Sequence, residues 1–92
     1  MRVQWTEAAI SDLTSICDYS RDHMGDKVAR ETALRIHDSV ASLPQFPQRG
    51  RVGRKVGTRE LVLPDLPFLA IYRIRVDSIE VIRILHGAQR WP

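Results

Sequence analysis

The first half of the chain places apolar residues at helical spacing, and the last third is typical of strands. A short strand is predicted over 2–5 and a helix over 7–24, where apolar positions recur at steps of three, four and seven. Thr6 is a suitable N-cap for this helix, and Gly25 can stop it in a left-handed conformation. The expected inward stripe is Ile10, Leu13, Cys17 and Met24, with Ile16 and Tyr19 beside them.

A second helix is predicted from Asp26, a possible N-cap, to the residue before Pro44. Because so few residues separate the two helices, they are expected to form an antiparallel hairpin. Residues 44–57 are rich in proline, glycine and cationic side chains and are predicted to form one long loop, a feature that is often functional. The apolar stripe of the second helix consists of Val28, Thr32, Ile36, Val40 and Leu43.

Three further strands are predicted, over 59–63, 68–76 and 79–86. The break at Asp77 and Ser78 predicts a tight two-residue hairpin. This hairpin would pair Val76 with Ile79, Arg75 with Glu80, Arg73 with Ile82 and Leu69 with His86. Alternation would then direct Arg83 and Leu85 toward the helices, and Arg73, Arg75 and His86 toward the opposite face. The order βααβββ predicts one α+β domain over residues 1–92, with the helical hairpin packed on a small, mainly antiparallel sheet.

Composition excludes several classes of protein. The apolar runs are far shorter than the roughly 18 residues of a membrane span, and the start of the chain lacks the apolar stretch of a secretory signal. A single cysteine allows no intramolecular disulfide, so we expect a cytoplasmic protein. Residues 1–48 hold 5 Lys and Arg against 7 Asp and Glu, and residues 49–92 hold 9 against 4. The C-terminal half is therefore the basic half, which could attract nucleic acid or an acidic protein segment.

The candidate chemistry is cationic. His23, His37 and His86 have no metal-ligand spacing, Cys17 lies on the inward stripe, and there is no P-loop, so neither a metal nor a cofactor is expected. Cationic side chains precede, occupy and follow the sheet, and Trp91 lies close to the end of the chain. Two interpretations remain open: a metal-free ribonuclease, in which cations stabilise a phosphorane, or a binding module that uses arginine and tryptophan as anchors.

The order of elements, together with "RELVLPDLPFLAIYRIRVDSIEVIRILHGAQRWP" (59–92), resembles the RelE/ParE superfamily of toxins from bacterial type II toxin–antitoxin modules. "WTEAAISDLTSICDYSRDHMG" is similar to the first helix of that superfamily, and "YRI" and "IRILHGAQRW" resemble its ParE side. The RelE type implies a ribosome-dependent mRNA endonuclease with basic residues on two central strands. The equivalent positions here are Glu60, Val62 and Leu69, none of them basic; a register one residue earlier would give Arg59, Leu61 and Phe68.

The ParE resemblance implies a plasmid-stabilisation type of toxin that poisons DNA gyrase by binding. Its expected partner is a ParD-like antitoxin, whose tail folds on the toxin and whose other half binds operator DNA. The candidate partner-binding residues are Arg73, Arg75, His86, Gln89, Arg90 and Trp91. In the alternative nuclease, the catalytic residues would be Arg59, Arg83, His86 and Arg90. A toxin fold that has lost its activity and persists as a binding domain is a third possibility.

Overall fold

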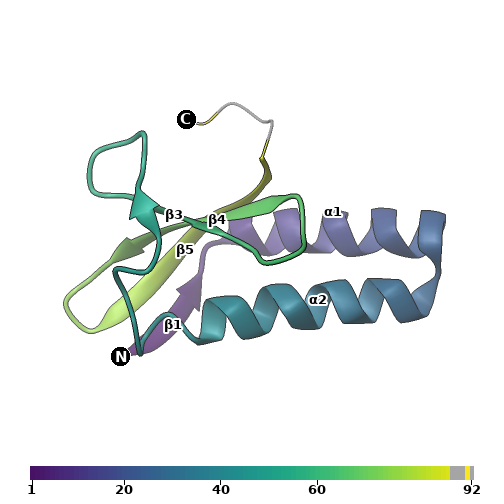
Figure 1. Cartoon of the computed structure of the whole chain (residues 1–92), viewed down its shortest axis with the longest axis horizontal. Helices are drawn as coiled ribbons and strands as arrows, with labels where there is room; N and C mark the ends of the chain where they lie inside the picture. Colours follow the sequence, from purple (N-terminus) through teal and green to yellow (C-terminus); the bar gives the residue numbers. More distant parts are fainter. Residues whose placement is uncertain (88–90, 92) are drawn as a thin grey trace.

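The computed structural model describes residues 1–87 and 91 of the chain. Its elements are β1 (Arg2–Trp5), α1 (Glu7–Met24), α2 (Asp26–Ala41), β2 (Arg51–Val52), β3 (Arg59–Val62), β4 (Phe68–Ile74) and β5 (Ser78–His86). The strands form one sheet in the order β1-β5-β4-β3-β2, in which β1 is parallel to β5 and the other neighbours are antiparallel. The helices lie side by side against the sheet, and the tip of their hairpin projects beyond it (Figure 1). The predicted α+β fold is confirmed, with β2 as an additional strand inside the predicted 44–57 loop.

The ends of α1 follow the sequence. The Thr6 hydroxyl accepts a hydrogen bond from the backbone N–H of Ala9 and donates one to the carbonyl of Ile82, so the cap also fixes the helix to β5. Gly25 adopts a φ of +91°, which a side chain would disfavour, and reverses the chain between the helices. The N-cap of α2 is Gly25 and not Asp26, which the sequence had suggested; Asp26 lies in the first turn, where its charge suits the helix dipole.

The core lies between α2 and the sheet, and α1 closes one side of it. Ile36, Val40 and Leu43 are buried against Tyr72 and other sheet residues, so the predicted stripe of α2 is correct. The predicted stripe of α1 is partly wrong, because Ile10 and Met24 are 52% and 59% exposed. The buried positions of α1 are instead the small residues Ala9 and Ser20, which hydrophobicity alone does not single out. Neither helix in the described part of the chain has the length and apolarity needed to cross a membrane.

The β4–β5 hairpin differs from the predicted register. Ile74 pairs with Ile79 and Arg73 with Glu80, so the turn is longer than predicted, and Val76 is fully exposed within it. A bulge then shifts the register, because Tyr72 pairs with Val81 but its neighbour Ile71 pairs with Arg83. An extra residue in one strand exchanges the two faces beyond it. Ile84 therefore enters the core, and Arg83 and Leu85 lie on the opposite face, contrary to the prediction.

Candidate functional site

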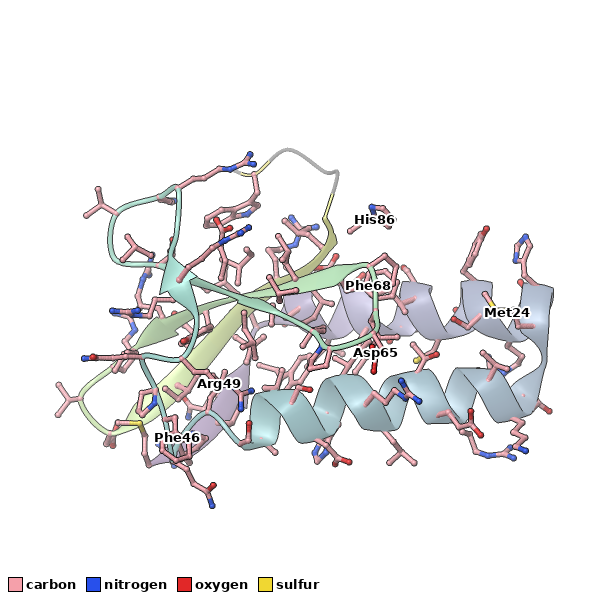
Figure 2. All side chains as sticks on the ribbon, viewed as in Figure 1. Met24, Phe46, Arg49, Asp65, Phe68 and His86 are labelled. Atoms are coloured by element: carbon pink, nitrogen blue, oxygen red, sulfur yellow. The ribbon has the colours of Figure 1, made fainter. Side chains whose placement is uncertain are left out.

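An apolar groove lies between the helical hairpin and the start of β4, with a volume of about 600 Å³. This helix groove is lined by residues that include Ile16, Tyr19, Met24, Val28, Phe68 and His86. Tyr19 and Met24 are 60% and 59% exposed, and His86 meets the Phe68 ring edge-on at 6.0 Å between ring centres (Figure 2). Two large apolar side chains of α1 are thus exposed at this groove, and half-buried apolar side chains of α2 and β4 line it, which is typical of a binding surface.

The turn between β3 and β4 forms one wall of the helix groove. The N–H of Leu66 donates to the carbonyl of Leu63, and Asp65 has a φ of +61°, as in a type II turn with Pro64 at its second position. The N–H of Leu63 donates to the carbonyl of Phe68, which closes the hairpin behind the turn. The sequence "LPDLPF" therefore folds locally in a way that places Phe68 opposite the helices.

A second depression, of about 640 Å³, lies at the other end of the molecule and is lined by Phe46, Arg49 and Ile74 among others (Figure 2). Ile74 also lines an adjoining hollow, of about 210 Å³, together with Val52 and Arg59. We call these five residues the loop patch. Phe46 is 64% and Val52 78% exposed, so the loop patch is also apolar and open to solvent.

Tyr72 fixes the segment that carries Phe46. Its side chain is fully buried, and its hydroxyl donates to the carbonyl of Pro47 at 2.6 Å and accepts from the N–H of Gly50 at 2.9 Å. A Cβ atom at Gly50 would lie 2.7 Å from the Tyr72 ring, so only glycine fits there. The Arg59 guanidinium adds bonds to the carbonyls of Gly50, at 2.7 Å, and Gln48, at 3.3 Å.

The sheet face away from the helices carries charged groups that are already paired. The buried carboxylate of Glu60 accepts from the Arg51 guanidinium, at 3.0 and 3.2 Å, and from the N–H of Arg54. The carboxylate of Glu80 lies 3.2 Å from Arg75 and 3.9 Å from Arg73, so Arg75 forms an ion pair with Glu80 although Arg73 is the residue opposite Glu80 in the sheet. Glu60 thus has a structural role in this fold, at a position where the RelE resemblance implies a basic residue.

The predicted partner-binding residues lie in separate places. Arg73 and Arg75 meet at Glu80, whereas His86 lies on the helix groove, six residues further along β5 or about 20 Å away at 3.3 Å per residue. Trp91 is half-buried, and the Lys55 ammonium lies 6.0 Å from its ring centre. Gln89 and Arg90 lie outside the described residues. The structure therefore brings Arg73 and Arg75 together and leaves His86 apart from them.

The alternative nuclease residues are also apart. The Arg83 guanidinium makes two bonds to the Asp12 carboxylate, at 2.7 and 2.9 Å, and the hydrogen bond to Asp12 raises the pKa of Arg83 above its usual value. Asp12 also accepts from the N–H of Ile84 at 3.0 Å. Arg59 lies opposite Tyr72 in the sheet, and Arg83 lies opposite Ile71. Because paired residues share a face and the neighbours Ile71 and Tyr72 point to opposite faces, the side chains of the two arginines leave the sheet on opposite faces. Arg90 of this set lies outside the described residues.

Cys17 is half-buried on α1, and burial raises the pKa of its thiol. A thiol with a raised pKa carries less thiolate at neutral pH and is a weaker nucleophile.

The sequence analysis did not select Phe46 or Tyr72 as site residues, although Phe46 belongs to the loop patch and Tyr72 supports it. The only signal for them was an aromatic residue between two prolines and a tyrosine in the middle of an apolar strand.

Comparisons with known structures define the class. The fold matches a chain of the "Chromosomal ParDE TA system from P. aeruginosa" with a TM-score of 0.87 and 31% identity, over 94% of this chain and 95% of that one. A conserved hypothetical protein of Helicobacter pylori shares the fold at a TM-score of 0.56 and 18% identity, over 97% of both chains. The protein is therefore a toxin of the RelE/ParE superfamily.

Sequence comparisons then give the family. Toxin Y4kP of Sinorhizobium fredii is 41% identical over 91 residues, covering 99% of this chain and 93% of the relative. Toxin RelE2 of Caulobacter vibrioides is 34% identical over 88 residues, covering 96% and 97%. Residues 3–91 match the model of the ParE toxin of the type II toxin–antitoxin system parDE, and the chain belongs to this family.

Proposed function

We propose that this toxin acts by binding DNA gyrase and that it performs no bond-breaking step of its own. The observation that carries the proposal is the way the sheet arginines are used. Arg59 is bound to loop carbonyls and Arg83 to Asp12, and they start from opposite faces, so they do not surround a common phosphate. A phosphorane is stabilised only by cations preorganised around it. Docking is the activity that the described surface supports better.

The neutralising partner is a ParD-like antitoxin that places an amphipathic helix in the helix groove. One support is the groove itself, which has apolar walls on α1, α2 and the start of β4. Another is the similarity to the P. aeruginosa chain, which comes from a ParDE system. Such an antitoxin would bind operator DNA through its other half, so that the complex represses its own operon. Both partners imply that the toxin works in the cytoplasm.

The test of the target is a supercoiling assay with purified gyrase. Inhibition with accumulation of cleaved DNA is the expected result, and in cells we expect an SOS response and filamentation. Full gyrase activity at toxin concentrations well above that of the enzyme would overturn the proposal. Deleting residues 89–92 should relieve toxicity while antitoxin binding is largely kept; a fully toxic truncation would assign the tail no role.

The helix groove can be tested separately with the product of the neighbouring reading frame. Met24→Glu places a charge in the groove and should weaken co-purification with that product, whereas Leu34→Glu changes an equally exposed residue outside the groove lining. Equal capture of both variants would exclude the groove as the antitoxin site.

A RelE-like mRNA endonuclease is the second candidate, and one observation favours it: the Caulobacter relative at 34% identity is named RelE2. In that function Arg59, Arg83, His86 and Arg90 would supply the cationic and acid–base groups. Primer extension on mRNA from translating ribosomes incubated with purified toxin would reveal cleavage. Cuts at defined codons, absent in an Arg59→Ala variant that remains folded, would replace the gyrase proposal.

A further inference from the structure

We propose that the loop patch is where the toxin holds its target, and that it receives an acidic segment of that protein carrying an apolar side chain. The inference rests on the proposed function, because it assumes that the toxin acts by binding a protein. Phe46 is the anchor on the toxin side, and Arg49 and Arg59 supply the charge. The surface is distinct from the helix groove assigned above to the antitoxin, and Figure 2 shows Phe46 and Met24 near opposite ends of the molecule.

The first reason is that an exposed aromatic side chain is presented on a fixed backbone. Successive turns, in which the N–H groups of Gln45, Phe46 and Arg49 each donate to the carbonyl three residues earlier, shape the segment. The buried Tyr72 hydroxyl and the Arg59 guanidinium then tie it to the sheet. Binding costs less when the anchor is already ordered, and aromatic side chains in well-packed centres dominate many interfaces. The fold thus holds Phe46 in place while leaving 64% of it exposed.

The second reason is charge. The charged residues that line the two hollows of the loop patch are Arg49 and Arg59, and no carboxylate of the described chain lines either hollow. The Arg49 guanidinium donates to the carbonyl of Ser39 and Arg59 to loop carbonyls, so both positive charges are held in place, and neither forms an ion pair with a carboxylate of residues 1–87. A partner segment that bears carboxylates would complement them.

The third reason is the apolar area between the arginines, which favours a protein over a nucleic acid. Ile74 joins the two hollows, and Phe46 and Val52 extend the apolar surface on either side. Phosphate groups need cations and hydrogen-bond donors but gain nothing from exposed aliphatic side chains. An acidic segment with a leucine-like side chain would use both features.

The experiment measures binding of toxin variants to immobilised, purified DNA gyrase by biolayer interferometry. Phe46→Ser should weaken binding by about 30-fold or more, as expected of an interface hot spot, and Phe46→Leu should restore most of it. Leu34→Ser is the matched control, because Leu34 is 60% exposed on α2 and lines neither the loop patch nor the helix groove. Since Phe46 and Leu34 are both exposed, each variant should melt within about 4 °C of wild type.

Two charge-reversal variants, one in the loop patch and one outside it, complete the design. Arg49→Glu should weaken binding by about tenfold or more and Arg35→Glu, on the exposed side of α2, by less than about twofold. The neighbouring-frame antitoxin should bind Phe46→Ser as it binds wild type.

Each outcome decides between the proposals. If wild-type toxin does not bind gyrase, the proposed target and this inference both fail. If wild type binds and Phe46→Ser binds equally well, only the inference fails. It also fails if nuclease treatment of the gyrase sample abolishes binding, because the ligand is then DNA, or if Phe46→Ser loses the antitoxin together with gyrase.

Discussion

Replacing Tyr72 by phenylalanine tests whether one buried hydroxyl holds the 44–50 segment in place. The variant keeps the aromatic ring in the core but removes the bond to the Pro47 carbonyl and the bond from the Gly50 N–H. Gly50 is buried, so its N–H would lose its partner, at a cost of about 1–3 kcal/mol. The half-buried Pro47 carbonyl can turn to water, and its lost bond adds about 0.5–1.5 kcal/mol. We expect Tyr72→Phe to lower the free energy of unfolding by about 2–4 kcal/mol.

Urea unfolding followed by circular dichroism measures this loss, and thermal melting should show a fall of roughly 10–30 °C for a domain of this size. Tyr19→Phe is the control, because Tyr19 is 60% exposed and should change stability by less than about 0.5 kcal/mol. Trypsin should also cut the Tyr72→Phe variant faster after Arg49, Arg51 or Arg54, since the segment opens more often. If both variants were as stable as wild type and equally resistant to trypsin, the hydroxyl would not be what fixes the segment.

Three further predictions concern other parts of the fold. Asp12→Ala removes three hydrogen bonds and leaves the Arg83 guanidinium without its carboxylate, so we expect the free energy of unfolding in urea to fall by about 2–3 kcal/mol. The control Asp18→Ala breaks only an exposed pair with Arg21 and should cost less than about 1 kcal/mol. Equal losses in the two variants would contradict this prediction. Asp65→Gly should raise the free energy of unfolding by about 0.5 kcal/mol because glycine adopts a positive φ freely, whereas Asp65→Val should lower it. If both variants melted at the same temperature as wild type, there would be no backbone strain at this turn. Because burial raises the pKa of the Cys17 thiol, this cysteine holds less thiolate at pH 8 than a free cysteine does. Ellman's reagent should therefore react more slowly with the protein than with glutathione at pH 8, and the reaction should become faster only at higher pH. A rate equal to that of glutathione at pH 8 would refute this prediction.

The sequence predicts those parts of the fold that depend on neighbouring residues. Thr6 and Gly25 mark the ends of α1 because capping and positive φ are local properties, and the stripe of α2 is visible because all its positions except Thr32 are apolar. The face of α1 is less visible, since Ala9 and Ser20 are buried for their small size and not for their hydrophobicity. The strand β2 has only two residues, and the bonds from its Arg51 to the buried Glu60 carboxylate of β3 are not revealed by periodicity.

The misplaced face of Arg83 has a definite physical origin. A longer turn and a bulge between β4 and β5 change the register twice, and side-chain alternation converts a shift of one residue into an exchange of faces. The Asp12–Arg83 bonds also join residues 71 positions apart in the chain, a separation over which no sequence pattern acts. These limits affected the predicted site more than the fold, because His86 was grouped with Arg73 and Arg75 on one sheet face and the bulge places His86 on the other.

Charge counting and surface chemistry therefore lead to different views of this toxin. The basic half of the chain suggested a cationic surface free to bind phosphate, yet Arg51 and Arg83 bind carboxylates of the protein itself, and Arg73 shares Glu80 with Arg75. The described surface instead offers exposed apolar side chains at two separate places, the helix groove and the loop patch.

Two separate surfaces allow the antitoxin and the target to bind at different places on the toxin. An antitoxin that fills only the helix groove would then leave Phe46 accessible, so neutralisation requires either that its chain continues to the loop patch or that it blocks the target by its bulk. Antitoxin fragments of increasing length, titrated against toxin bound to gyrase, would separate these routes. If the chain must reach the loop patch, displacement begins only with fragments long enough to protect Phe46; if bulk suffices, displacement begins while Phe46 is still accessible.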